Sequence, residues 1–354
     1  MIIVDVHAHV FPSLKNKSGY NDIDLNPQIN QNKVRGAWGR MKTNTLDESY
    51  IPEFGEDVNF TIDNYGKFHW TKQGKECWMK RFPAIMQNLE WSPELMIACM
   101  DEVGVDKAIL QSGYMEMNFE YSYFKEITKK WAERLIGTIT IDYDLEKDRQ
   151  YRQREVDKIK KISTSDGIKG VYQAFPRGQK IDDIEFEPLW KELSNHKLPH
   201  FFYVGFQPKE QYLQSLKQIE KVLRKFPSLI GIINHLGGNI RPEWDLKYTN
   251  GKELLKVLEL PNAYFEVGYV LAYENWIFWK ENYEYPYPLH TGLIRMIYEE
   301  IGCERLLWGS DMPNLYRTCT YQQCLDLVRL HFDFLSEGEK NLVLGGNAIK
   351  IFKL

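Results

Sequence analysis

The chain has 354 residues, with 45 Lys and Arg against 49 Asp and Glu, and a formal net charge of −4. A chain with no excess of positive charge lacks the electrostatic signature of nucleic-acid binding, so we expect no nucleic-acid partner. Hydrophobic residues make up 43% of the sequence, which is the composition of a globular protein large enough to fold without disulfides.

The sequence predicts a cytoplasmic protein without a membrane anchor. The five cysteines are an odd number and form no CxxC pair, which favours free thiols in a reducing compartment. No apolar run approaches the ~18 residues that a membrane-spanning helix needs. The first residues, MIIVDVHAHVFP, lack the basic region and the long apolar region of a signal peptide, so we expect them to form a strand.

Eight short apolar segments recur along the chain, and amphipathic stretches separate most of them. Strands that alternate with helices favour a parallel sheet, and eight such units favour closure into a (β/α)₈ TIM barrel. A doubly wound open sheet is the alternative, but no GxGxxG sequence follows the first segment. The predicted strands are residues 2–6, 107–111, 135–141, 168–173, 200–204, 229–234, 263–267 and 306–309.

Residues 15–98 interrupt this alternation as a long insertion after the first strand. They are rich in Asn, Asp, Gly, Lys and Trp and show little strand or helix periodicity before Ser92. SPELMIACMDEVGV then predicts a helix, with Ser92 as N-cap and Gly104 at its end. Because an insertion after a barrel strand lies at the catalytic face, we expect a single barrel domain over 1–354, in which 15–98 form an aromatic-rich lid.

The strongest chemical signal is the sequence VDVHAH at residues 4–9. Successive side chains of a strand alternate between its two faces, so His7 and His9 project from the same face. At the carboxyl end of a first barrel strand this face is the barrel mouth, and two neutral imidazoles there form half of a metal site. Asp5 has the same parity, which makes it either a further ligand or a carboxylate that orients a ligand.

Asp311 follows the eighth apolar segment, in the sequence LLWGSDMP. Strands one and eight are neighbours in a closed barrel. A carboxylate at this position can therefore bind a metal held by His7 and His9, or it can transfer a proton. An Asp that caps the next helix is the common alternative, but its combination with the VDVHAH motif favours a functional role.

His235 ends the sixth apolar segment, in the sequence GIINHLGG. Gly237 and Gly238 follow it, and glycines let the backbone come close to a ligand. A histidine at this position is either a metal ligand or a general acid/base with a pKa near the working pH. A hydrogen-bonded core histidine is the remaining alternative.

Taken together, these motifs resemble the amidohydrolase-2 family, which includes aminocarboxymuconate-semialdehyde decarboxylase and the dihydroxybenzoate (γ-resorcylate) decarboxylases. The similar segments are VDVHAH, SPELMIACMDEVGVDKAIL, FEPLWKEL, INHLGG, WGSDMP and GGNAIKIFKL. The resemblance implies a (β/α)₈ barrel, one divalent ion, zinc or manganese, and a homodimer. It also implies that His7, His9 and Asp311 bind the metal and that His235 lies nearby without binding it.

The fifth segment departs from the family pattern. Relatives usually carry a metal-binding histidine in a sequence such as LPVFIH, whereas this chain has LPHFFYVG, which places Tyr203 at the ligand position. His200 lies three residues earlier, about 10 Å back along the strand and with the opposite parity. The fourth ligand is therefore Tyr203, Asp5 or water, or the site binds metal weakly.

A second departure concerns the group that would hold a substrate carboxylate. Decarboxylases of the family often use an arginine before the turn that resembles WSPE, and residues 87–90 contain none. Arg81 is the nearest candidate, with Arg40 and Arg177 as rivals. The predicted substrate-binding residues are therefore Tyr203 and Arg81.

The resulting prediction is a metal-dependent non-oxidative decarboxylase, a C–C lyase, that acts on a small aromatic or unsaturated carboxylic acid. His235 or Asp311 would deliver a proton to the carbon that loses CO₂. A hydrolase of a lactone, amide or ring C–C bond is the alternative, with Asp311 as the base for a water whose pKa the metal lowers. A non-catalytic binding barrel is the third hypothesis, and the missing strand-five histidine is its main support.

Overall fold

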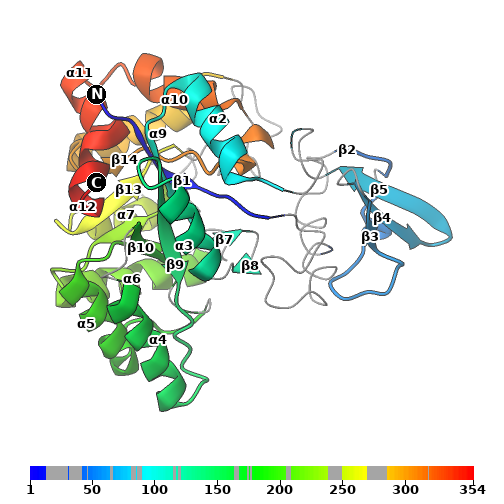
Figure 1. The fold of residues 1–354 in the computed structure, drawn as a ribbon, viewed down its shortest axis with the longest axis horizontal. Helices are drawn as coiled ribbons and strands as arrows, with labels where there is room; N and C mark the ends of the chain where they lie inside the picture. Colours follow the sequence, from blue (N-terminus) through cyan, green and yellow to red (C-terminus); the bar gives the residue numbers. More distant parts are fainter. Residues whose placement is uncertain are drawn as a thin grey trace. The chain divides into compact units, whose positions relative to one another are not determined.

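The computed structural model describes residues 1–12, 31, 42–45, 47–63, 67–80, 85, 90–114, 117–118, 121–162, 167–173, 175, 178–204, 209–237, 249–268, 285–317 and 319–354. These residues form two compact units. The first unit takes in residues 1–9, 97–112 and 121–354, and the second takes in residues 10–96 and 113–120, as far as each is described. Figure 1 shows the helices and strands of both units.

The first unit is built on eight parallel strands, and consecutive ones pair through hydrogen bonds. At the two ends of the sheet, Val6 N donates to Trp308 O at 3.0 Å, and Asp311 N donates to His7 O at 2.7 Å. The chain after the last strand therefore lies beside the first, and the predicted (β/α)₈ barrel is confirmed. In sheet order, the strands are β1 Val4–Ala8, β6 Lys107–Leu110, β9 Leu135–Thr140, β10 Ile168–Gln173, β11 His200–Phe202, β12 Gly231–Ile233, β13 Ala263–Glu266 and β14 Leu306–Leu307.

Helices separate most of these strands, as the sequence predicts. The amphipathic stretch between the fifth and sixth of these strands forms α6, and the stretch at the end of the chain consists of α11, the π-helix η8 and α12 (Figure 1). The helix bounds are α2 Pro93–Val103, α3 Tyr121–Lys130, α4 Arg149–Ile162, α5 Glu187–His196, α6 Lys209–Lys225, α7 Thr249–Leu258, α9 Pro288–Ile301, α10 Tyr321–Asp326, α11 Glu337–Asn341, η8 Leu342–Gly346 and α12 Asn347–Phe352.

The first strand, β1, begins two residues later than the sequence predicts and includes His7. Ile2 is 47% exposed, whereas all five residues of β1 are buried. The pairing of β1 with β6 shifts register between Asp5 and Ala8, as at a β-bulge. His7 lies within this irregular stretch, and bulges of this kind can re-aim side chains.

Apolar side chains from strands around the barrel form its core, and residues of α12 pack with them. Parallel strands that are covered by helices bury both of their faces, which is why these strands read as apolar runs rather than as alternating patterns. The buried cluster contains Val4, Val6, Ile109, Ile136, Phe201, Ile232, Tyr264, Leu307, Ala348, Ile351 and Phe352.

The second unit contains an antiparallel sheet in the order β2 (Lys42–Thr43), β5 (Lys75–Lys80), β4 (Lys67–Lys72) and β3 (Thr61–Ile62). The expectation of little strand periodicity in 15–98 is therefore wrong for these residues. Their own buried cluster consists of Ile51, Val58, Phe68, Trp70, Cys77 and Met79.

The hairpin between β4 and β5 shows the signal that the sequence analysis missed. Gln73 and Gly74 both have positive φ, 54° and 70°, as in the two-residue turn that matches the twist of a hairpin. On either side of this turn, KFHWTK and KECWMK place buried and more exposed residues in alternation. The role of 15–98 as a lid stays a prediction.

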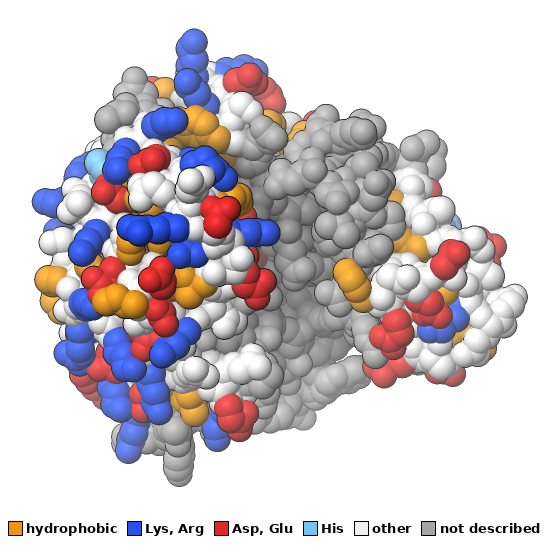
Figure 2. Space-filling view, turned by 90° about the horizontal axis from the view of Figure 1, so that it is seen from below, with side chains coloured by type: hydrophobic (Ala, Val, Ile, Leu, Met, Phe, Trp, Pro, Cys, Tyr) orange, Lys and Arg blue, Asp and Glu red, His pale blue; other side chains and the backbone are white. Residues whose placement is uncertain are grey.

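Charged side chains of both signs are interspersed on the face shown in Figure 2. Ion pairs among the described residues include Arg224 with Glu220 at 2.9 Å and Lys221 with Asp182 at 2.9 Å. All five cysteines are free and buried, as the sequence predicts. Among the helices that the structure describes, none is both long enough and apolar enough for a membrane crossing.

Candidate active site

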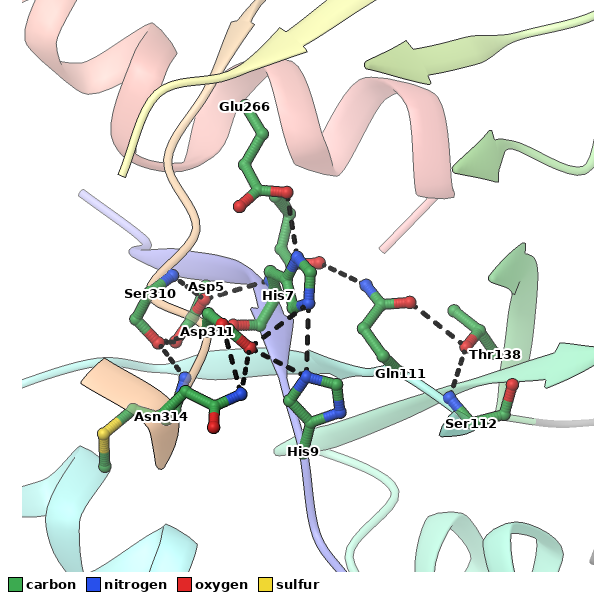
Figure 3. Close-up of polar contacts among 12 residues, drawn as sticks. Asp5, His7, His9, Gln111, Ser112, Thr138, Glu266, Ser310, Asp311 and Asn314 are labelled. Carbon is green, nitrogen blue, oxygen red and sulfur yellow. Dashed lines mark hydrogen bonds and ion pairs between the residues drawn. The ribbon is translucent and has the colours of Figure 1, made fainter. Parts of the chain in front are cut away.

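His7, His9 and Asp311 meet at one point although they come from opposite ends of the chain (Figure 3). The Nε2 atoms of the two histidines are 3.2 Å apart. Asp311 Oδ1 lies 2.9 Å from His9 Nε2 and 3.5 Å from His7 Nε2. All three side chains are almost fully buried. The three residues that the sequence singles out as metal ligands are therefore brought together.

The spacing of these three atoms fits a bound divalent ion. Metal–ligand bonds of about 2.0–2.2 Å place neighbouring ligand atoms roughly 3.0–3.5 Å apart at tetrahedral or octahedral angles. The separations here are 2.9, 3.2 and 3.5 Å. Two imidazole nitrogens and one carboxylate oxygen are also ligands that suit zinc and related transition metals. The chain can thus hold a divalent ion at this point.

The backbone around Asp311 fixes the direction of its carboxylate. Asp311 has φ +59°, in the left-handed region that residues other than glycine seldom adopt. Asn314 Nδ2 donates to both carboxylate oxygens, at 3.1 and 3.2 Å. Burial alone would raise the pKa of Asp311, but the hydrogen bond from His9 and the charges on His7 and His9 lower it to about 2. The carboxylate is therefore ionised and ready to bind a cation.

His235 lies directly beside His7 at the end of β12. The two ring centroids are 4.7 Å apart, and a ligand atom of His235 lies within 4.8 Å of ligand atoms of His7 and Asp311. Three consecutive residues, His235, Leu236 and Gly237, have positive φ between 50° and 66°. Such strain persists where the surrounding structure enforces it, often at functional sites. Burial, together with a smaller effect of the neighbouring His7, lowers the pKa of His235 to about 4.

The structure places Tyr203 and His200 in different surroundings, as their parity predicts. The half-buried Tyr203 ring stands perpendicular to the His235 ring, with centroids 5.2 Å apart. His200 instead packs among Phe175, Trp190 and Phe202, and its ring nitrogens have no hydrogen-bond partner among the described residues. Tyr203 is therefore next to the site, and His200 belongs to an aromatic cluster.

Asp5 is held in a hydrogen-bond network of its own. Its carboxylate accepts from the backbone N–H groups of His7 and Ser310, at 3.0 and 2.9 Å. It also accepts from the Ser310 hydroxyl and from Tyr321 OH, the latter at 2.7 Å. Burial nevertheless raises the pKa of Asp5 to about 6. Of the two roles left open for Asp5, this geometry favours the orienting carboxylate, because its oxygens tie β1 to the chain after β14.

Two residues that the sequence analysis missed also face the site. Glu266, the last residue of β13, places Oε2 2.9 Å from His7 Nδ1. The Tyr172 ring on β10 stands roughly perpendicular to both His7 and His9, at centroid distances of 5.8 and 6.1 Å. A signal for Glu266 existed in the sequence, because it is a lone acidic residue at the end of the apolar segment 263–267.

The arginines that were considered for substrate binding lie outside the described residues. These are Arg81, Arg40 and Arg177. The contact of Arg81 with a substrate carboxylate therefore stays a prediction.

A protein-family model for amidohydrolases matches residues 4–354. The chain belongs to the amidohydrolase family. The expectation of an enzyme of the decarboxylase or hydrolase type is thereby confirmed, and the alternative of a non-catalytic barrel is not supported. No match was found among curated protein sequences.

Solved structures with the same fold match this chain over nearly its full length, at low sequence identity. A zinc-bound amidohydrolase from Burkholderia multivorans is 13% identical, with 100% of both chains covered and a TM-score of 0.65. The 5-carboxyvanillate decarboxylase from Sphingomonas paucimobilis is 14% identical over 100% of this chain and 99% of that one, with a TM-score of 0.56. A protein from Pseudomonas putida assigned as a 2-pyrone-4,6-dicarboxylic acid hydrolase is 14% identical over 99% and 97%, with a TM-score of 0.59.

Proposed function

We propose that this amidohydrolase is a metal-dependent non-oxidative decarboxylase of an aromatic or unsaturated carboxylic acid. The observation that carries the proposal is the convergence of His7 Nε2, His9 Nε2 and Asp311 Oδ1 within 3.5 Å of one another, with the His235 ring beside them. The match to a 5-carboxyvanillate decarboxylase over the full chain supports it. The proposal includes one zinc or manganese ion and a cytoplasmic homodimer.

His7, His9 and Asp311 are the residues that would hold the ion. When bound, the ion supplies a positive charge that stabilises the negative charge developing as a carboxylate leaves as CO₂. The aromatic ring of Tyr172 lies next to His7, and that of Tyr203 lies next to His235. A flat, unsaturated substrate suits such ring surfaces, because offset and edge-to-face ring contacts are favourable.

His235 is the better of the two predicted proton donors. Asp311 has its pKa lowered to about 2 and stays ionised, so it carries no proton to give at neutral pH. The pKa of His235 is low in the free protein because of burial, but a substrate carboxylate beside it favours the imidazolium form. As the C–C bond to the carboxylate breaks, the electron pair stays on the substrate carbon. That carbon takes the proton from His235, which is reprotonated by water.

The test is product analysis on a panel of aromatic and unsaturated acids with protein reconstituted with zinc or manganese. A decarboxylase releases one CO₂ per product molecule, and in D₂O it places deuterium on the carbon that lost the carboxylate. The proposal is overturned if every substrate that turns over takes up ¹⁸O from labelled water and none releases CO₂.

Hydrolysis of a lactone is the second candidate, and the ionised Asp311 favours it. A carboxylate with a low pKa cannot donate a proton, but it can orient a water molecule and accept a proton from it. The match to a protein assigned as a 2-pyrone-4,6-dicarboxylic acid hydrolase also supports this alternative, over nearly the same share of the chain as the decarboxylase match. The ¹⁸O experiment separates the two reactions, because only hydrolysis incorporates oxygen from water.

A further inference from the structure

Glu266 contacts His7 on the side of the imidazole ring that faces away from His9. Its Oε2 lies 2.9 Å from His7 Nδ1, and Figure 3 shows the carboxylate across the ring from His9. Both side chains are completely buried. A neutral imidazole has one nitrogen that donates and one that accepts, whereas a carboxylate can only accept. While Glu266 is ionised, its hydrogen bond with His7 therefore requires the proton on Nδ1.

We propose that Glu266 is a positioning residue that holds His7 in the Nδ1–H tautomer, so that the Nε2 lone pair faces His9 and Asp311. With the proton on Nδ1, Nε2 is the free donor atom, and it lies 3.2 Å from His9 Nε2 and 3.5 Å from Asp311 Oδ1. The opposite tautomer would direct an N–H into the place of the ion. This inference rests on the metal site of the proposed function, and it adds a residue to that site.

The surrounding residues fix the plane of the His7 ring but not its tautomer. Rings of Tyr172, Phe201 and His235 pack around it at centroid distances of 5.8, 6.4 and 4.7 Å. These contacts restrict rotation of the ring, and they act the same on either tautomer. The polar contact that selects where the proton lies is the one between His7 Nδ1 and Glu266.

The chain just after β14 leaves the space in which His7 and Glu266 approach each other. A Cβ atom on Gly309 would come within 3.0 Å of His7 Cβ and 3.1 Å of Glu266 Cγ. Both distances are tighter than ordinary carbon contacts, so a larger residue at this position would push the two side chains. Glycine after β14 therefore lets the ends of β1 and β13 approach closely enough for the hydrogen bond.

Histidine ligands in metal sites commonly donate their second N–H to a carboxylate, and loss of that partner typically costs 10–100-fold in metal affinity. Three variants of the full chain test whether Glu266 acts in this way. Glu266→Leu removes the acceptor, and Glu266→Gln keeps one acceptor oxygen. Phe201→Leu is the matched control, because it changes packing against His7 but leaves the hydrogen bond.

The decisive readout is the tautomer of His7 in the metal-free protein, from two-bond ¹⁵N–¹H spectra of histidine-labelled samples assigned with His7→Asn. We expect the Nδ1–H form in the wild type and in Phe201→Leu, and a shift towards the Nε2–H form in Glu266→Leu. Zinc affinity, measured by chelator competition, should fall about 10–100-fold in Glu266→Leu and less in Glu266→Gln.

The inference is overturned if wild-type His7 carries its proton on Nε2, a result that needs no variant to fold. It is also overturned if Glu266→Leu keeps both the Nδ1–H form and the wild-type zinc affinity. Because the spectra need neither metal nor substrate, they stand apart from the product analysis. A failure of the decarboxylase proposal would leave the tautomer result intact.

Discussion

His9 Nε2 lies 2.9 Å from Asp311 Oδ1, although 302 positions separate the two residues in the sequence. His9 comes directly after the first barrel strand, and Asp311 comes shortly after the last. Closure of the barrel therefore creates this contact, since strands one and eight become neighbours only when the sheet closes. The contact between the proposed ligands therefore depends on the folded barrel, so a metal ion bound there would add to stability.

Replacing His235 with Asn should lower turnover by about 10²–10⁴-fold, the usual contribution of a positioned acid or base. Zinc affinity should stay close to the wild-type value, because the proposed ligands are His7, His9 and Asp311. Steady-state kinetics and chelator competition measure the two effects. His196→Asn, at a half-exposed position of α5, is the control. A loss of zinc from the His235 variant as large as that from His7→Ala would make His235 a ligand instead.

Replacing Tyr203 distinguishes a metal ligand from a substrate contact. A phenol has an ordinary pKa near 10 and is a poorer zinc ligand than imidazole at neutral pH. Tyr203→Phe should therefore keep most of the metal while it slows the reaction or weakens substrate binding. Tyr203→His should tighten metal binding, because it restores an imidazole at the position that the resemblance assigns to a ligand, on a residue whose present ring lies beside His235. Metal affinity of both variants is the measurement.

Two outcomes would contradict this interpretation of Tyr203. If Tyr203→Phe loses metal as completely as His7→Ala does, the phenol is a ligand. If neither variant changes affinity or rate, the alignment of the fifth strand is wrong.

His200 should make the protein less stable in acid. Burial lowers its pKa in the folded state to about 3, against 6.5 for an ordinary histidine. As the pH falls below about 6.5, the unfolded state binds a proton that the folded state does not, so stability is lost progressively between pH 6.5 and 3. One such group removes about 2 kcal/mol between pH 7 and 5.

The corresponding measurement is urea unfolding of His200→Val at pH 7 and pH 5. The drop in unfolding free energy between the two pH values should be smaller than in the wild type by about 2 kcal/mol. Phe202→Leu in the same aromatic cluster is the control, which should lose stability equally at both pH values. An unchanged pH dependence in His200→Val would show that another group causes the acid sensitivity.

Gly309→Ala should destabilise the barrel by about 1–3 kcal/mol, the usual cost of overpacking. The new Cβ would lie 3.0 Å from His7 Cβ and 3.1 Å from both Glu266 Cγ and Val6 Cγ2. Gly292→Ala is the matched control in α9, because its Cβ would meet nothing within 4 Å, and it should stabilise the helix by about 0.5–1 kcal/mol. Urea unfolding of both variants checks the prediction, and equal effects would contradict it.

The barrel, and the meeting of His7, His9 and Asp311, could be predicted from sequence because both follow from the pattern of strands along the chain. Buried parallel strands read as apolar runs, and all eight segments correspond to strands. His7, His9 and Asp311 follow from their places at strand ends, since barrel closure makes the first and last strands neighbours. His200 and Tyr203 were separated correctly because side chains alternate along a strand.

Glu266 and Tyr172 were missed because their roles depend on distances across the barrel. Glu266 is 259 positions from its partner His7. Tyr172 lies on β10, three strands away from β1 in the sheet, and its ring comes close to those of His7 and His9 in the closed barrel. The hairpin of β4 and β5 was missed for another reason. Its turn uses Gln73 and Gly74 rather than the Asn-Gly or Asp-Gly pairs that mark such turns most clearly.

The most direct test of the central claim is zinc and manganese binding to metal-stripped protein, followed by calorimetry. The wild type should bind one ion per chain at a site that requires His7, His9 and Asp311. His7→Ala and Asp311→Ala should each abolish tight binding and activity together, while His196→Asn should bind like the wild type. Wild-type metal content and affinity in His7→Ala would contradict the assignment of the site.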